Sequence, residues 1–271
     1  MNKIKVVDDN LQIVNVKNNI YVEYYEKECL FAINEIKIVV TPDSKNHNND
    51  LEIEINLKKD TKLNFGIKLE SDTNLNLNIV TKGKTGKVQY RYTLSENSKC
   101  NVVKFQNVDS IKEMIVVNLE EEKAEFNYNF KTISHEKETY DYHIFHNSKN
   151  TISNIKNNGV CIKDGVMIYQ VSSFVPKDIT GCIVNQNNRI INLTDNKCEI
   201  MPNLYIDSSD VEASHSALIG KFSDEEMFYM QSRGIDYNTA LKLLITGFLT
   251  SDIENKKLLK EVNKNIEKYW R

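Results

Sequence analysis

The chain has 271 residues, of which 40% are hydrophobic and 27% are charged, and this balance excludes an intrinsically disordered protein. Its 35 basic and 38 acidic residues give a formal net charge of −3. So small a charge gives no reason to expect nucleic acid or an anionic membrane as a partner.

Acidic side chains interrupt the N-terminal residues before any apolar segment develops. No stretch of the chain approaches the roughly 18 apolar residues that a membrane span requires. We therefore expect neither an export signal nor a membrane anchor, and we predict a cytoplasmic protein.

The cysteines are odd in number, lie far apart and form no Cys-x-x-Cys pair, which disfavours both a disulfide framework and structural zinc. We expect each of them to be a small buried apolar residue. Cys161 and Cys182 are separated by about two coils if the chain forms a solenoid, so stacking of these two is an open alternative. The five cysteines are Cys29, Cys100, Cys161, Cys182 and Cys198.

From about Leu11 to Lys221 apolar and polar residues alternate, as in Leu51, Ile53 and Ile55, which predicts strands with one buried face. Such runs recur about every 10 to 12 residues, as in a sandwich, a barrel or a β-solenoid. The 3 prolines and 9 glycines are few for the tight turns of a sandwich. Asparagine is abundant, tolerates the left-handed corner conformation and can form ladders between stacked coils. We therefore favour a parallel β-helix over residues 1–222, with a sandwich as the alternative.

Residues 223–271 show helical patterns instead. Ser223 and Glu226 form a capping box, and the helix that they begin is expected to end at Gly234. Asp236 is expected to cap a second helix that runs toward Gly247.

A second capping box, Ser251 with Glu254, predicts the start of a third helix. The expected architecture is a β body followed by a small α-helical segment. The third helix should present one apolar stripe, formed by Leu258, Leu259, Val262, Ile266, Tyr269 and Trp270.

Two adjoining segments resemble the SufB/SufD family. Residues 201–220 contain a Pro-x-Leu-x-Ile strand, an acidic turn and a Ser-His-x-Ala-x-Ile-Gly stretch like those at the end of the family's core. Residues 228–235 are similar to the family's Phe-Tyr-x-x-x-Arg-Gly-Ile signature. The resemblance is specific over residues 140–248 and only architectural before them. Further matching positions are Asp141, His146, Ser153, Gly159, Val160, Ala240, Leu243, Leu244, Gly247 and Phe248.

This resemblance implies a right-handed parallel β-helix followed by C-terminal helices. It also implies a complex with the ABC-type ATPase SufC, which docks on the helical segment, and pairing of SufB- and SufD-type subunits. The large N-terminal helical domain of longer family members is expected to be absent or much reduced, because strands begin almost at once.

The departures from the family pattern favour a SufD-like subunit over a SufB-like one. The cluster-assembly cysteine of SufB-type chains corresponds to Asn187, and an amide cannot supply the soft thiolate that iron or persulfide sulfur prefers. The glutamate after the SufB-type histidine corresponds to Ser216, and a cysteine found in many SufD-type chains corresponds to Ala213. Of this group only His215 is kept.

His215 is the candidate metal residue: the resemblance makes it an interfacial iron ligand, and the alternative is a hydrogen-bonded histidine that fixes the strand end. His135, His143 and His146 suggest a metal cluster at first sight. However, residues 143 and 146 would point to opposite faces of a strand, so we interpret these histidines as surface or turn residues.

The C-terminal helices contain the candidate partner-binding residues. An apolar helix face with arginine is typical of interface hot spots, although ordinary helix packing and capping would use the same residues. The candidates are Phe228, Tyr229, Arg233, Gly234, Gly247 and Phe248.

The sequence thus predicts a non-catalytic SufD-like scaffold that pairs through an edge strand with a SufB-type subunit or with itself. ATP itself should not bind, because no GxxxxGK[ST] loop is present. No stably bound cofactor is expected, while transient iron or an iron–sulfur cluster at a subunit interface stays open. The alternatives are a homodimeric SufB-like scaffold that uses Cys161, Cys182 or Cys198, a β-helical polysaccharide-active enzyme, and a purely structural interaction module.

Overall fold

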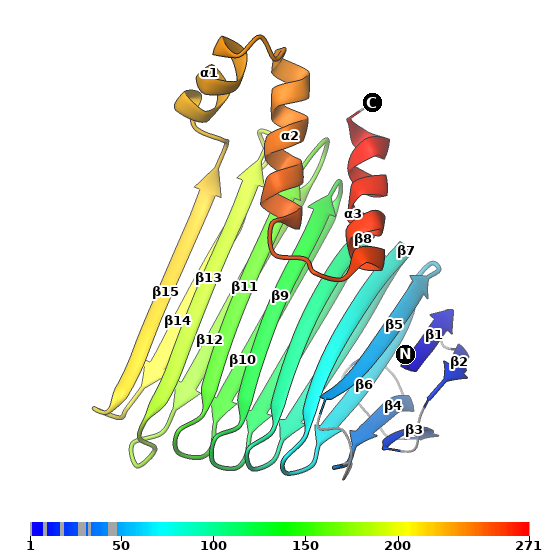
Figure 1. The fold of residues 1–271 in the computed structure, drawn as a ribbon, viewed down its shortest axis with the longest axis vertical. Helices are drawn as coiled ribbons and strands as arrows, with labels where there is room; N and C mark the ends of the chain where they lie inside the picture. The colour runs from blue at the N-terminus through cyan, green and yellow to red at the C-terminus, as the bar shows by residue number, and fades with distance from the viewer. Residues whose placement is uncertain are drawn as a thin grey trace.

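The computed structural model describes residues 2–7, 10–16, 19–26, 31, 34–42 and 48–270. Strands wind into a solenoid with two walls, and three helices follow (Figure 1). The expected parallel β-helix with a C-terminal helical segment is therefore confirmed. Antiparallel pairing occurs in β1 with β2 and in β3 with β4, at the N-terminal end, and the successive coils are parallel.

We call the two walls the front wall and the back wall. The long strands β7 (Asn74–Leu94) and β8 (Lys99–Leu119) pass from the front wall into the back wall. The front wall also contains β1 (Asn2–Val7), β2 (Asn10–Asn15), β5 (Asn48–Leu57), β9 (Glu125–Ser134), β11 (Ile152–Cys161), β13 (Cys182–Asn192) and β15 (Val211–Gly220). The back wall also contains β3 (Ile20–Glu26), β4 (Asn34–Val40), β6 (Thr61–Leu69), β10 (Lys137–His146), β12 (Val166–Val175) and β14 (Glu199–Ile206).

The coils are in register, so that like residues stack from one coil to the next. The alternation read from the sequence places apolar side chains inside, for example Leu51, Leu77 and Val102, which are 0–1% exposed. Six side-chain hydrogen bonds of 2.7–3.0 Å link a ladder on the front wall, which confirms the asparagine ladder expected for stacked coils. Its members are Asp50, Asn76, Asn101, Asn127, Asn154, Asn185 and Ser214.

Corners between strands use residues with positive φ, as the abundance of asparagine predicts. Asn97 and Asn150 have φ values of 53° and 58°, in the left-handed region that asparagine tolerates. Inside the coils, tyrosines fill the core: Tyr90, Tyr92, Tyr128, Tyr140 and Tyr142 are at most 2% exposed. Their alternation therefore reflects packing of the core.

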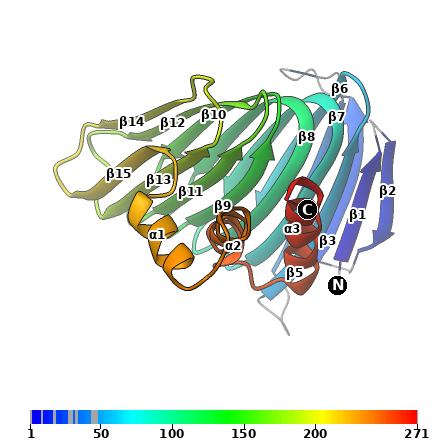
Figure 2. The ribbon, with the colours of Figure 1, turned by 90° about the horizontal axis from the view of Figure 1, so that it is seen from above.

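Helices α2 (Tyr237–Thr250) and α3 (Lys256–Tyr269) lie on the outer face of the front wall, and the back wall carries no helix among the described residues (Figure 2). Leu258, Val262 and Ile266 of α3 are at most 2% exposed, which confirms the apolar stripe predicted for this helix. Burial of each such side chain is worth roughly 1.5–3 kcal/mol. In the same cluster they meet Phe105 and Ile133 of the wall.

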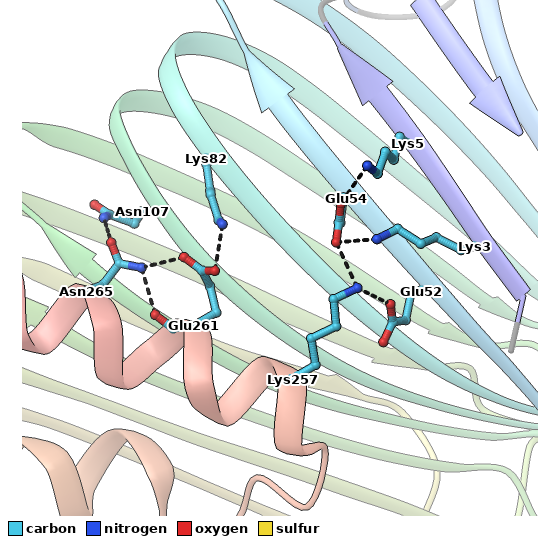
Figure 3. Close-up of polar contacts among 9 residues, drawn as sticks. All are labelled: Lys3, Lys5, Glu52, Glu54, Lys82, Asn107, Lys257, Glu261 and Asn265. Carbon is cyan, nitrogen blue, oxygen red and sulfur yellow. Dashed lines mark hydrogen bonds and ion pairs between the residues drawn. The ribbon is translucent and has the colours of Figure 1, made fainter. Parts of the chain in front are cut away.

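Polar contacts also hold α3 on the front wall (Figure 3). The Lys257 ammonium lies 2.6 Å from a Glu52 oxygen and 2.9 Å from a Glu54 oxygen. One turn further along, Glu261 pairs with Lys82 at 2.8 Å. Contacts at both the helix start and its middle fix α3 along the strands.

Helix α1 (Asp224–Ser232) begins with the predicted capping box, in which Ser223 and Glu226 satisfy each other's backbone amides. It ends before Gly234, whose φ of 82° suits glycine. Asp236 caps α2, also as predicted. The first two helix starts are therefore confirmed.

Two expectations about helix ends are wrong. Helix α2 continues through Gly247 and ends at Thr250, because glycine is tolerated inside a helix when the surrounding residues pack well. The second capping box does not form: Ser251 is the C-cap of α2, and Asn255 caps α3 by accepting bonds from two amides. Among the described helices none is long and apolar enough to cross a membrane. The division at residue 222 into two domains stays a prediction.

Candidate functional site

The last coil of the solenoid, formed by β14 and β15, is left uncovered. Among the residues that the structure describes, β15 pairs only with β13 and β14 only with β12, so their outer edges carry free ladder groups. Ile219 stands in register with Ile190, yet Ile219 is 41% exposed and Ile190 is fully buried. Leu218, Met201 and Tyr205 are 54%, 39% and 54% exposed. Together these residues form the candidate site, which we call the open end.

His215 lies at this open end. It is in register with Gln186, which is buried inside the coil and donates hydrogen bonds to Ser173 Oγ at 2.9 Å and to the Asn203 carbonyl at 3.2 Å. Paired residues of parallel strands point to the same side, so His215 occupies the inward column but has no coil above it. The structure thus leaves the candidate metal residue exposed on the last coil, and metal binding by His215 stays a prediction.

The positions that departed from the family pattern lie around His215. Asn187 is exposed on β13 and is in register with Ser216 of β15. Ala213 is in register with Val184 on the inward side. No group of three His, Cys, Asp or Glu side chains that could hold a metal occurs in the part of the chain that the structure describes.

Four cysteines lie inside the solenoid as the composition predicted, whereas Cys29 falls outside the described residues. The suggestion that Cys161 stacks on Cys182 is wrong, because each coil contains two strands and Cys161 is in register with Asn192. Instead Cys161 Sγ lies 3.4 Å from Cys198 Sγ. This hydrogen bond lowers the pKa of Cys198 to about 7 and raises that of Cys161.

The six helix residues predicted to bind a partner separate into two groups. Phe228 and Tyr229 are 73% and 58% exposed on α1, and the Arg233 guanidinium lies 5.3 Å from the Tyr229 ring. By contrast, Phe248 packs on the front wall, where the Arg189 guanidinium lies 5.2 Å from its ring. An exposed apolar pair with an arginine is available for a partner on α1.

The two glycines of that set differ as well. Gly234 terminates α1 with its positive φ, as expected for a capping role. Gly247 lies within α2 and is exposed, and a Cβ at this position would meet no atom within 4 Å. The described contacts of these two glycines therefore give no evidence for a role in partner binding.

Several upstream positions that match the family are structural. The interpretation of His146 as a surface or turn residue is wrong: it is a fully buried residue of β10. Its ring lies between Thr151 Oγ1 at 2.8 Å and Ser153 Oγ at 2.9 Å, and burial lowers its pKa to about 4. A Cβ at Gly159 would lie 2.3 Å from Met167 Sδ, so a larger residue there would require the buried Met167 side chain to shift. His135 and His143 contact Asp109 and Asp141 separately, at 3.2 Å and 2.9 Å.

A buried ionisable network inside the middle coils was not predicted. Lys104 and Glu113 are fully buried and bonded to each other. Burial lowers the pKa of the lysine and raises that of the glutamate, and their mutual attraction opposes both shifts. On the next coil Glu138 accepts hydrogen bonds from Tyr140 Oη at 2.7 Å and Thr132 Oγ1 at 2.9 Å, and burial raises its pKa to about 7.

The sequence did contain a signal for this network. Lys104 is two residues after buried Val102, and Glu113 is two residues from both Ile111 and Ile115, so both charged residues occupy inward positions of the alternation. A charged residue at an inward position of an alternating strand predicts a buried ion pair when another inward position of the same coil, here on the same long strand β8, offers the opposite charge.

The fold and its open end define a parallel β-solenoid protein with C-terminal helices and an unpaired coil edge. The sequence matches the family described as "SUF system FeS cluster assembly, SufBD core domain" over residues 13–248. The chain therefore belongs to the SufBD core family of iron–sulfur cluster assembly proteins.

Curated relatives match shorter segments. The iron–sulfur cluster assembly protein SufD of Bacillus subtilis is 30% identical over 115 residues, which are 40% of this chain and 26% of that protein. A SufBD family iron–sulfur cluster assembly protein of Mycobacterium leprae is 38% identical over 73 residues, 26% of this chain and 19% of that protein. The chloroplastic protein ABCI7 of Arabidopsis thaliana is 46% identical over 55 residues, 20% of this chain and 12% of that protein. The matched segments thus span at most about a quarter of these relatives.

Proposed function

We propose that this chain is a non-catalytic, SufD-like accessory subunit of a SufBCD-type iron–sulfur cluster assembly complex in the cytoplasm. In this proposal β14 and β15 pair with a SufB-type subunit or with a second copy of the chain. The α1 surface receives a SufC-type ABC ATPase. No cofactor stays bound to the isolated chain, and His215 would face any iron or cluster that passes through the subunit interface.

The observation that carries the proposal is the uncovered last coil. Ile219 is 41% exposed although it stands in register with fully buried Ile190, and the outward side chains of Leu218, Met201 and Tyr205 are exposed on the same coil. Among the described residues, the outer edges of β14 and β15 pair with no further strand. A second chain that added a strand to this edge would satisfy the backbone groups and cover Leu218, Ile219 and Tyr205.

The SufD-like role is supported by the side chains at that end. Asn187 and Ser216 provide an amide and a hydroxyl where a SufB-like chain would have a thiol and a carboxylate, and neither is a soft ligand for iron or sulfur. A SufB-like scaffold would need thiols near the interface. Cys161, Cys182 and Cys198 are at most 7% exposed, which disfavours that alternative.

The polysaccharide-active alternative is also disfavoured. The carboxylates that approach each other on neighbouring coils, Glu113 and Glu138, are fully buried inside the solenoid. A glycosidase needs its two carboxylates on either side of a bound sugar.

The ATPase-docking part of the proposal depends on α1. We would co-purify the full chain with the SufB-type and SufC-type proteins of the same organism, and compare a Phe228→Ser/Tyr229→Ser variant. The matched control is Tyr21→Ser, which removes an exposed aromatic ring, 54% accessible, from the N-terminal end. We expect the wild type and the control to capture both partners, and the α1 variant to lose the ATPase alone.

Retention of the ATPase by the α1 variant would contradict docking on this surface. Failure of the wild-type chain to capture either partner would contradict the proposed function as a whole. Point substitutions are preferable to removal of residues 223–271, because loss of α2 and α3 would uncover Phe105 and Ile133.

A further inference from the structure

Four lysines gather at one corner of the solenoid, at the start of the back-wall strands. Lys62 of β6, Lys87 of β7 and Lys112 of β8 stand directly in register on successive coils. Lys137 lies at the start of β10 and receives a hydrogen bond from Ser110 Oγ on its carbonyl, at 2.7 Å. All four are exposed.

This arrangement is electrostatically unfavourable in the isolated chain. Neighbouring strands are about 4.7–4.9 Å apart, and like charges directly opposite each other destabilise a sheet. None of the four lysines has an acidic partner within 4.0 Å among the described residues. Elsewhere on the solenoid lysines do pair with acids, as Lys82 does with Glu261 at 2.8 Å and Lys99 with Glu125 at 2.7 Å.

The lysines border a hollow rather than a flat face. The hollow has a volume of about 620 Å³ and is lined by all four lysines together with the hydroxyl-bearing residues Thr85, Ser110 and Thr139. This volume is in the range of sites for small molecules, and it exceeds what a single inorganic ion requires. Of the described residues that line the hollow, Asp60 alone is acidic.

The side chains that line the hollow indicate which chemical class of ligand could bind there. Ammonium groups and hydroxyls donate hydrogen bonds to anionic oxygens, and a row of them suits a ligand with several charges along its length. The described lining contains no aromatic ring on which a base could stack, and Ile111 is its one large apolar side chain. A nucleic acid strand or a nucleobase is therefore less well matched than a compact oxyanion.

We propose that this lysine hollow binds a small, multiply charged oxyanion, a phosphate chain or a polycarboxylate, that spans at least two successive coils. The ligand offsets the repulsion within the lysine row, so binding also stabilises the fold. The hollow lies at the corner where the back-wall strands begin, is distinct from the open end formed by β14 and β15, and so extends beyond the proposed assembly function.

The test is calorimetric titration of the full chain with sodium tripolyphosphate and, separately, with citrate, at low ionic strength. The variant is Lys87→Gln/Lys112→Gln, and the matched control is Lys68→Gln/Lys177→Gln, which removes two exposed lysines away from the hollow. We expect the wild type and control to bind at least one probe, and the variant to bind it at least about tenfold more weakly. Which probe binds tells a phosphate chain from a polycarboxylate.

The substituted chain should fold, because neutralising lysines that repel one another leaves the melting temperature unchanged or raises it. Addition of the bound probe should raise the melting temperature of the wild type and not that of the variant. Equal binding by wild type and variant, or no binding of either probe by the wild type, would overturn the proposal. Tighter binding of a single-stranded oligonucleotide than of both probes would overturn it as well.

Discussion

The middle coils and the last coil of the solenoid have the same alternating pattern and opposite surroundings. In the middle, inward side chains such as Tyr92 and Phe126 are fully buried between the coils on either side. In the last coil, inward Ile219 is 41% exposed and outward Tyr205 is 54% exposed. What differs is the presence of a further coil, and under the proposed function a second chain takes its place.

Substitutions in the middle coils and at the open end should therefore have different effects. Substitutions in the middle should change the stability of the chain, because every side chain there has neighbours on two coils. Substitutions at the open end should change association and leave stability almost unaltered.

The largest effect is expected in the middle, from Lys104→Met. This change leaves the Glu113 carboxylate buried without its partner, and breaking a buried pair in this way costs about 3–5 kcal/mol of unfolding free energy. Urea unfolding measures the loss. The control is the double variant Lys104→Met/Glu113→Leu, which removes both charges and should recover most of the stability. Equal stability of the single variant and the wild type would contradict a charged pair in the core.

A second effect in the middle depends on pH. The pKa of Glu138 is raised by burial from its usual 4.5 to about 7, so the folded chain holds a proton there that the unfolded chain has lost. This contribution is complete below about pH 4.5 and disappears as the pH rises through 7, and it amounts to roughly 3 kcal/mol. Glu138→Gln lacks it, so the variant should gain stability relative to the wild type between pH 5 and pH 8. Parallel urea-unfolding profiles for the two proteins would contradict this.

The smallest effect on stability is expected on α1. Phe228→Ser with Tyr229→Ser removes rings that are 73% and 58% exposed, so thermal unfolding should change by less than about 0.5 kcal/mol. A large loss of stability would mean that these rings pack on the chain itself and are not free for a partner.

Features that depend on a few residues close together in the sequence, such as helix caps and strand alternation, could be predicted. Ser223 caps α1 because the hydroxyl and Glu226 are within one turn of each other. The Ser251 capping box had the same pattern and failed, because Asn255 offered a cap closer to the apolar stripe of α3. The alternation of apolar and polar residues predicted the strands and their inward residues, because it too depends only on residues close together in the sequence.

The register between successive coils could not be predicted from such local patterns. Cys161 meets Cys198 and not Cys182 because the number of residues per coil depends on corner lengths, which vary along the chain. The in-register stacking of Lys62 on Lys87 depends on that register too. Lys104 and Glu113, by contrast, both lie on β8 and meet inside a single coil. At the open end the sequence identified His215, and exposure at that end became visible only with the coils in place.

The central claim is that the open end pairs with another chain of this family. Its most direct test is sedimentation of the full chain, alone and with its SufB-type partner, for the wild type, Ile219→Glu and Ile13→Glu. Ile13 is a matched control, 52% exposed at the opposite end of the solenoid. We predict that the wild type and Ile13→Glu form a dimer, with the partner or with themselves, and that Ile219→Glu stays monomeric with unchanged unfolding free energy. Dimers formed equally well by Ile219→Glu would contradict the account.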